Sequence, residues 1–279
     1  MFKKRQRSNE PASERIIIED LSKQLIPITG TKPFAISIHN LLTPNECTDL
    51  IQRAEDLGFD DALIQGPDGK QILCQNIRRC GRCIIDDVAL ADAIYIRILN
   101  ALRGTEFEKK IMHAPWVTNS SRSTSLISSS SSSSSLENNN NAEAITAVGL
   151  NERIRFLKYE PGHFFAPHQD IRFVRGLDSG DKAGEMSHIT VQLYLNEKFK
   201  GGSTRFLCGK RHYDVIPKVG SALIFDHDLL HEGVKVKGGI KYSVRTDIMF
   251  TPPKSASSTA TSSRRDRDPL GIFGSAPQA

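Results

Sequence analysis

The chain contains 279 residues, of which 38% are hydrophobic, and its formal net charge is +5. This length and composition suffice for a substantial core, whereas no run of about 18 apolar residues occurs that could form a transmembrane helix. The modest charge, with no aromatic and basic surface for stacking on bases, argues against direct nucleic-acid binding.

The N-terminal residues 1–30 are expected to form a flexible basic tail. This tail contains Lys3-Lys-Arg-Gln-Arg7, which could serve as a nuclear-import signal, and it lacks the apolar segment of a secretory signal. We therefore expect a cytoplasmic protein, with nuclear import as the alternative.

Residues 31–118 are expected to form a helical region that supports the rest of the fold. The tetrapeptide Thr43-Pro-Asn-Glu46 supplies an N-cap, a proline at the first helical position and a capping-box glutamate, and apolar residues follow at helical spacing. A second helix should begin at Asp86 or Asp87 and end at Gly104. The apolar stripes of such helices are expected to pack on a sheet.

Five cysteines without a secretory signal fit reduced thiols better than a disulfide framework. Cys80-Gly-Arg-Cys83 could be half of a zinc site or a redox pair. No second pair of cysteines or histidines stands nearby to complete four zinc ligands, and the motif does not open a helix after a strand. We expect ordinary core or surface thiols.

Residues 119–145 are rich in serine and asparagine, including a polyserine tract. Such a segment cannot bury enough apolar area to offset its ordering entropy, so we expect a disordered insertion. Residues 254–279 are expected to form a flexible C-terminal tail, in which basic and acidic residues alternate. The intervening residues 146–253 should form a domain.

The segment 146–253 has the pattern of a β-rich domain. Apolar and polar residues alternate in Arg153–Tyr159 and in Ser187–Leu195, as is typical of strands with one buried face. Between these segments lies the tripeptide His-Gln-Asp at 168–170. In an extended strand alternate side chains share a face, so His168 and Asp170 should project together.

Two imidazoles and one carboxylate can occupy one face of an octahedral Fe(II) and leave three positions open. A second histidine must then come from a distant strand, and three candidates follow: His212, His227 and His231. His212 lies in a polar, turn-like stretch and is expected at the surface. The other two both follow the apolar run Ser221–Phe225. By itself, a lone His-x-Asp is most often a surface pair.

The chain resembles the prolyl 4-hydroxylase-like branch of the Fe(II)/2-oxoglutarate dioxygenases in seven short motifs. Each motif is weak alone, but all seven occur in the family's order over roughly a third of the chain. They are Arg155-Phe-Leu-Lys-Tyr159, Pro167-His-Gln-Asp170, Leu193-Tyr-Leu-Asn196, Gly201-Gly-Ser-Thr-Arg-Phe206, Pro217-Lys-Val-Gly-Ser-Ala-Leu-Ile-Phe225, His231-Glu-Gly233 and Gly239-Ile-Lys-Tyr242.

The resemblance implies an α+β fold with a mainly β core, a double-stranded β-helix (jelly roll), supported by an N-terminal helical layer. Residues 146–253 would be the dioxygenase domain. The resemblance favours His231 as the distal ligand, so that His168, Asp170 and His231 are the metal ligands and catalytic residues. It implies Fe2+, 2-oxoglutarate as cosubstrate and O2, with ascorbate as a candidate reductant.

The far carboxylate of 2-oxoglutarate requires a cation in the pocket wall. Lys241 takes the position of the family's cation, and Arg245, on the same strand face, is the alternative. Tyr194 matches a family tyrosine whose hydroxyl reaches the cosubstrate, while Tyr159 either lines the same cavity or is a core tyrosine. Phe165 stands where many prolyl hydroxylases carry tyrosine, a departure that bears on the substrate more than on iron.

The expected activity is hydroxylation of a substrate, first of all a prolyl or other residue of a polypeptide, with release of succinate and CO2. The alternatives are oxidation of a small molecule or an alkylated base, or a catalytically silent jelly-roll module that binds a partner. A complete set of iron ligands with a carboxylate clamp argues against the silent module. No membrane partner is expected.

Overall fold

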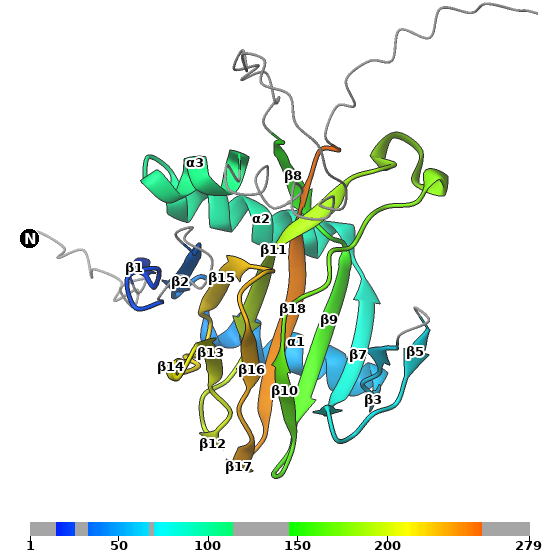
Figure 1. Cartoon of the computed structure of the whole chain (residues 1–279), viewed down its shortest axis with the longest axis vertical. Helices are drawn as coiled ribbons and strands as arrows, with labels where there is room; N and C mark the ends of the chain where they lie inside the picture. The colour runs from blue at the N-terminus through cyan, green and yellow to red at the C-terminus, as the bar shows by residue number, and fades with distance from the viewer. Residues whose placement is uncertain (1–14, 26–32, 67–69, 114–144, 253–279) are drawn as a thin grey trace, which may run out of the picture.

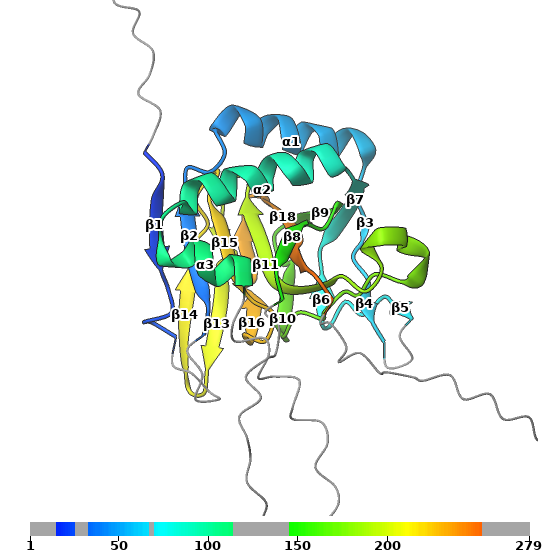
Figure 2. The same cartoon turned by 90° about the horizontal axis from the view of Figure 1, so that it is seen from above.

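The computed structural model of the chain describes residues 15–25, 33–66, 70–113 and 145–252. In these residues two antiparallel sheets form a double-stranded β-helix, and helices lie on one side of the larger sheet (Figures 1 and 2). The expected insertion at 119–145, apart from Ile145, and the expected tail at 254–279 lie outside the described residues.

The larger sheet has nine strands. Two of them coincide with the strands expected from alternation, β9 fully and β11 to within one residue at each end. In spatial order the strands are β1 (Ile17–Asp20), β2 (Ala35–His39), β15 (Ala222–Asp226), β11 (Met186–Tyr194), β18 (Lys241–Phe250), β9 (Arg153–Tyr159), β7 (Gly81–Asp86) and β3 (Asp60–Asp61), and β8 (Ala147–Leu150) pairs with the end of β18.

The smaller sheet has five strands and carries part of the functional site. Its strands in spatial order are β14 (Arg211–Val215), β13 (Thr204–Cys208), β16 (His231–Gly233), β10 (Phe164–His168) and β6 (Arg78–Arg79). Two short two-stranded sheets pair β12 (Lys200–Gly201) with β17 (Val236–Gly238) and β4 (Ile64–Gln65) with β5 (Gln71–Ile72), and a 3-10 segment, η1, spans Leu177–Lys182.

Both expected helices are confirmed. Helix α1 (Pro44–Leu57) begins with the capping box, in which the Thr43 side chain accepts a hydrogen bond from the Glu46 backbone N–H. Helix α2 (Val88–Leu102) is capped by Asp87 and buries four apolar side chains in the core beneath the larger sheet. A third helix, α3 (Glu106–His113), follows. None of the helices in the described residues is long and apolar enough to cross a membrane.

Strand β1 corrects the expectation that residues 1–30 form a flexible tail throughout. Its residues pair with β2 from Ile17 opposite His39 to Asp20 opposite Ile36. Just beyond it, Leu21 is 1% exposed and packs in the cluster that also holds side chains of β11, β13 and β15. The segment 17–21 is therefore part of the folded sheet and its core.

The region 31–118 supplies strands as well as helices. Strand β2 pairs with β15, and β7 pairs with β9, so strands from this region border the later strands on both sides. Cys80 and Cys83 are buried free thiols, in keeping with the expectation of core thiols.

Candidate functional site

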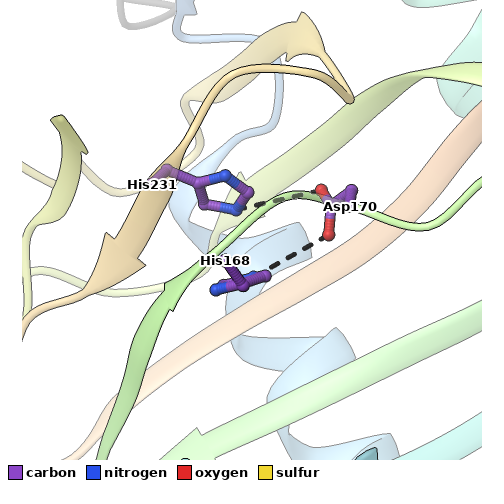
Figure 3. Close-up of side chains that lie close together, drawn as sticks. All are labelled: His168, Asp170 and His231. Carbon is purple, nitrogen blue, oxygen red and sulfur yellow. Dashed lines mark ion pairs between the residues drawn. The ribbon is translucent and has the colours of Figure 1, made fainter. Parts of the chain in front are cut away.

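Two histidines and one aspartate meet where β10 and β16 run side by side. His168, the last residue of β10, lies opposite His231, the first residue of β16. The Nε2 atom of His168 lies 3.9 Å from Oδ1 of Asp170, and Nε2 of His231 lies 3.8 Å from Oδ2 (Figure 3). One ligand atom from each residue lies within 4.8 Å of the others, so one metal ion could be held by all three.

Hydrogen bonds to the backbone fix both imidazoles with Nε2 toward the aspartate. Nδ1 of His168 lies 2.8 Å from the Ala166 carbonyl oxygen, and Nδ1 of His231 lies 2.8 Å from that of Leu229. A carbonyl can only accept, so each Nδ1 carries the proton and each Nε2 keeps a lone pair. Burial lowers the pKa of His168 to about 3 and also lowers that of His231, which keeps both rings neutral as a metal requires.

Asp170 is held from three directions. It lies just beyond the end of β10, where its backbone N–H donates to the His227 carbonyl at 3.0 Å. Its Oδ2 accepts from the Thr190 hydroxyl, and its Oδ1 lies 3.0 Å from Nη2 of Arg245. Burial alone would raise the pKa of Asp170, but the charge of Arg245 holds it below its usual range. The carboxylate is therefore ionised and fixed.

A small cavity adjoins these residues and is lined by side chains of both sheets. Lys241, the first residue of β18, reaches it although it is only 2% exposed. Its Nζ donates to the Gly202 carbonyl at 2.7 Å, and no carboxylate of the described residues lies within ion-pair distance. Burial lowers the pKa of Lys241 to about 7. The cavity wall thus contains a cation without a counter-ion.

Arg245 lines the same cavity, but its charge is already paired. Its Nη2 lies 3.0 Å from Oδ1 of Asp170 and 3.0 Å from Oδ1 of Asp247. Strand alternation places Lys241 and Arg245 on the same face and does not distinguish their roles. Their surroundings differ, because Lys241 faces neutral groups and Arg245 faces two carboxylates.

Both candidate tyrosines lie next to Lys241. The Lys241 Nζ is 5.4 Å from the ring centroids of Tyr159 and Tyr194. The hydroxyl of Tyr194 donates to the Thr204 hydroxyl at 2.7 Å, and burial raises the pKa of both tyrosines. Tyr159 lines the cavity and also packs in a small buried cluster, so it meets both descriptions that the sequence left open.

The strands that carry these residues match a known family. Residues 154–246 match the model of the 2OG-Fe(II) oxygenase superfamily. The match covers a third of the chain, including the strands that carry His168, His231 and Lys241, and it supports a 2-oxoglutarate- and Fe(II)-dependent dioxygenase. A comparison with curated protein sequences found no significant match.

The chain is similar to several solved structures. A prolyl-4-hydroxylase from Pseudomonas putida is 19% identical, with 75% of this chain and 88% of that chain covered and a TM-score of 0.44. A viral collagen prolyl hydroxylase from Paramecium Bursaria Chlorella virus-1, solved as its 2OG complex, is 17% identical over 77% and 95%, with a TM-score of 0.41. A prolyl hydroxylase from Trichoplax adhaerens, in complex with a hypoxia inducible factor peptide fragment, is 14% identical over 77% and 82%, with a TM-score of 0.46.

The donor set fits the cofactors of the matched family, Fe2+ and 2-oxoglutarate, with O2 as the oxidant. Two neutral imidazoles with free Nε2 atoms and one ionised carboxylate form the facial set that suits Fe(II). When bound, the iron and its cosubstrate supply oxidising chemistry that amino-acid side chains lack.

The other candidate histidines lie outside this group of three. His212 is exposed, as expected, although it lies in strand β14 and not in a turn. His227 is 0% exposed, and its Nε2 lies 3.4 Å from Oδ1 of Asp247, beside the site. Among the described residues, His231 alone joins His168 and Asp170.

Several residues of the site were not found from the sequence. Thr190 and Gln192 face the cavity from β11, and their alternation with buried apolar residues is a signal that could have revealed them. Arg78 enters from β6, a strand of two residues with no pattern of its own. Phe165 stacks on His168, with ring centroids 3.5 Å apart, and so supports the first ligand.

Proposed function

We propose that the dioxygenase hydroxylates a prolyl residue within a polypeptide, with release of succinate and CO2. His168, Asp170 and His231 bind the Fe(II) and leave three positions for the cosubstrate and O2. The observation that carries the proposal is the presence, in one cavity, of this group of three and of the uncompensated cation of Lys241.

Lys241 anchors the far carboxylate of 2-oxoglutarate in this proposal. A buried ammonium without a counter-ion gains most from an incoming anion, because the anion offsets the desolvation cost that the empty site bears. The Tyr194 ring lies 5.4 Å from the Lys241 Nζ, and its hydroxyl, which donates to Thr204, contributes a further polar group. Arg245 instead orients Asp170, with which it is already paired.

A polypeptide substrate is supported by the ordered motifs shared with the prolyl 4-hydroxylase-like branch. It also fits the position of β6, which is the terminal strand of the smaller sheet among the described residues and borders the cavity through Arg78. An extended segment can add to such an edge through backbone hydrogen bonds. Phe165 lacks the hydroxyl of the family's usual tyrosine, and its ring instead packs between His168 and the Arg78 guanidinium.

The proposal is tested by incubating the full chain with Fe(II), 2-oxoglutarate, O2 and a library of prolyl peptides. The expected result is a mass gain of one oxygen atom on proline, with succinate formed in equal amount. The His231→Ala variant is the matched control and should form neither product. Succinate formation with no modified peptide, and oxygen incorporated instead into a small molecule, would contradict the polypeptide substrate.

A further inference from the structure

Arg78 is a charged side chain of the cavity that the cofactors do not need. It lies on β6, which pairs with β10 so that Arg78 stands opposite Phe165. Its guanidinium carbon lies 4.6 Å from the centroid of the Phe165 ring, and this ring stacks on His168 with centroids 3.5 Å apart. Arg78 is therefore one aromatic ring away from a ligand of the proposed iron site.

Arg78 has no ion-pair partner among the described residues; burial alone would lower its pKa, but nearby Cys80, Tyr159 and Asp170 raise it. Its Nε donates to the Cys80 thiol at 3.3 Å, and no carboxylate of the described residues lies within ion-pair distance of the guanidinium. Arg82, on the adjoining β7, is bonded through both Nη atoms to the Gln71 side-chain oxygen at 3.3 and 3.2 Å. Burial and the charge of Arg78 lower the pKa of Arg82. Two like charges thus lie near each other; Arg82 stands opposite Asp60 on β3, whereas Arg78, which lines the cavity, has no carboxylate of the described residues within ion-pair distance.

The remaining charges of the site are accounted for. Arg245 is paired with two carboxylates, and under the proposed function Lys241 takes the far carboxylate of 2-oxoglutarate while the metal takes its oxo-acid end. The cosubstrate then has no further carboxylate for Arg78. The anion that would neutralise this guanidinium must come from the substrate.

We propose that the substrate polypeptide carries an aspartate or glutamate next to the hydroxylated residue, and that Arg78 binds its carboxylate. This inference rests on the proposed function. The separation of Arg78 from His168 by one ring corresponds to roughly one or two residues of extended chain, since each residue advances the chain by about 3.3 Å. Arg78 is accordingly a specificity-determining residue.

The test measures peptide binding without turnover. The full chain is loaded with Mn(II) and N-oxalylglycine, an inert analogue of 2-oxoglutarate. Fluorescence anisotropy then compares two labelled peptides that differ only in Glu or Gln beside a single proline. The wild type should bind the Glu peptide about tenfold more tightly, as expected for one charge-assisted contact. Arg78→Gln should remove this preference, and Arg78→Glu should favour a Lys peptide.

Arg79→Gln is the matched control, because Arg79 is the exposed neighbour on the same strand and carries the same charge. It should keep the preference of the wild type. Equal binding of both peptides by the wild type, or equal loss in both variants, would overturn the inference and leave the proposed function intact. Weaker N-oxalylglycine binding by Arg78→Gln would assign Arg78 to the cosubstrate and also overturn it. If neither peptide binds, the polypeptide substrate itself is refuted and the inference falls with it.

Discussion

Replacing Lys241 with methionine should make the ligand-free protein more stable while it strongly weakens binding of 2-oxoglutarate. The substitution keeps an unbranched side chain of similar length but removes the buried ammonium. Replacing a residue that stabilises the fold lowers the free energy of unfolding, whereas replacing a buried charge that is retained for a ligand raises it.

The magnitude follows from the pKa of Lys241, which falls from 10.5 to about 7 through burial. One pKa unit corresponds to about 1.4 kcal/mol, so the ammonium costs the folded state about 4 kcal/mol at pH 7. Methionine removes this cost but leaves the Gly202 carbonyl without its donor, a loss of about 1 to 3 kcal/mol. The net expectation is a gain of about 1 to 3 kcal/mol in the free energy of unfolding.

The pH dependence gives an independent check. Because the folded pKa lies below the unfolded one, the unfolded wild type binds more protons between pH 7 and 10.5, and its stability rises with pH in that window. The wild type should therefore gain about 3 kcal/mol relative to Lys241→Met between pH 7 and about pH 10. Urea unfolding of the metal-free proteins measures this difference. The contributions of the other titrating groups are the same in both proteins and cancel.

Binding of 2-oxoglutarate is measured by anaerobic calorimetry on the Mn(II)-loaded proteins. Lys241→Met should weaken it by at least about 100-fold, as expected for loss of a buried charged contact. Lys237→Met, which removes an exposed lysine of β17, should change neither stability nor binding. A destabilised Lys241→Met variant with normal affinity would refute the reasoning and return the anchor role to Arg245.

Three further predictions test the metal ligands and their support. His231→Ala should weaken Mn(II) binding by at least about 100-fold, and retained affinity would exclude it as a ligand. Arg245→Met should weaken Mn(II) binding by about 10- to 100-fold, because Asp170 loses its ion pair; unchanged affinity would mean that Thr190 alone positions the carboxylate. Arg175→Met should lower the free energy of unfolding by about 2 to 4 kcal/mol in urea, because two glutamates lose their partly buried partner, whereas an unchanged Mn(II) affinity is expected from its distance in the fold.

Local signals explain what could be predicted from the sequence. The capping box at Thr43 and the cap at Asp87 act within one turn of helix, so both helices could be placed without tertiary information. The His-x-Asp pair and the distal histidine were found because the motifs around them resemble a family in both residue type and order. The jelly roll followed from the same resemblance.

Long-range pairing explains what could not be predicted. Lys241 and Arg245 share a strand face, so only the position of Asp170, set by the end of β10, separates their roles. Strand β1 is four residues long, and it forms only by pairing with β2. The basic residues that precede it in the sequence suggested a tail and gave no sign of this pairing. Arg78 lies on a strand of two residues, which has too few positions for any periodicity.

The strands of the oxygenase segment are enclosed by strands that precede them in the chain. Strand β2 pairs with β15 and β7 pairs with β9. These two earlier strands therefore border the later strands on both sides (Figure 1). A chain cut between His113 and Ile145 would yield two fragments, each with backbone edges that only the other can satisfy. We therefore expect the two fragments to be inactive when separate and to regain activity when they are mixed.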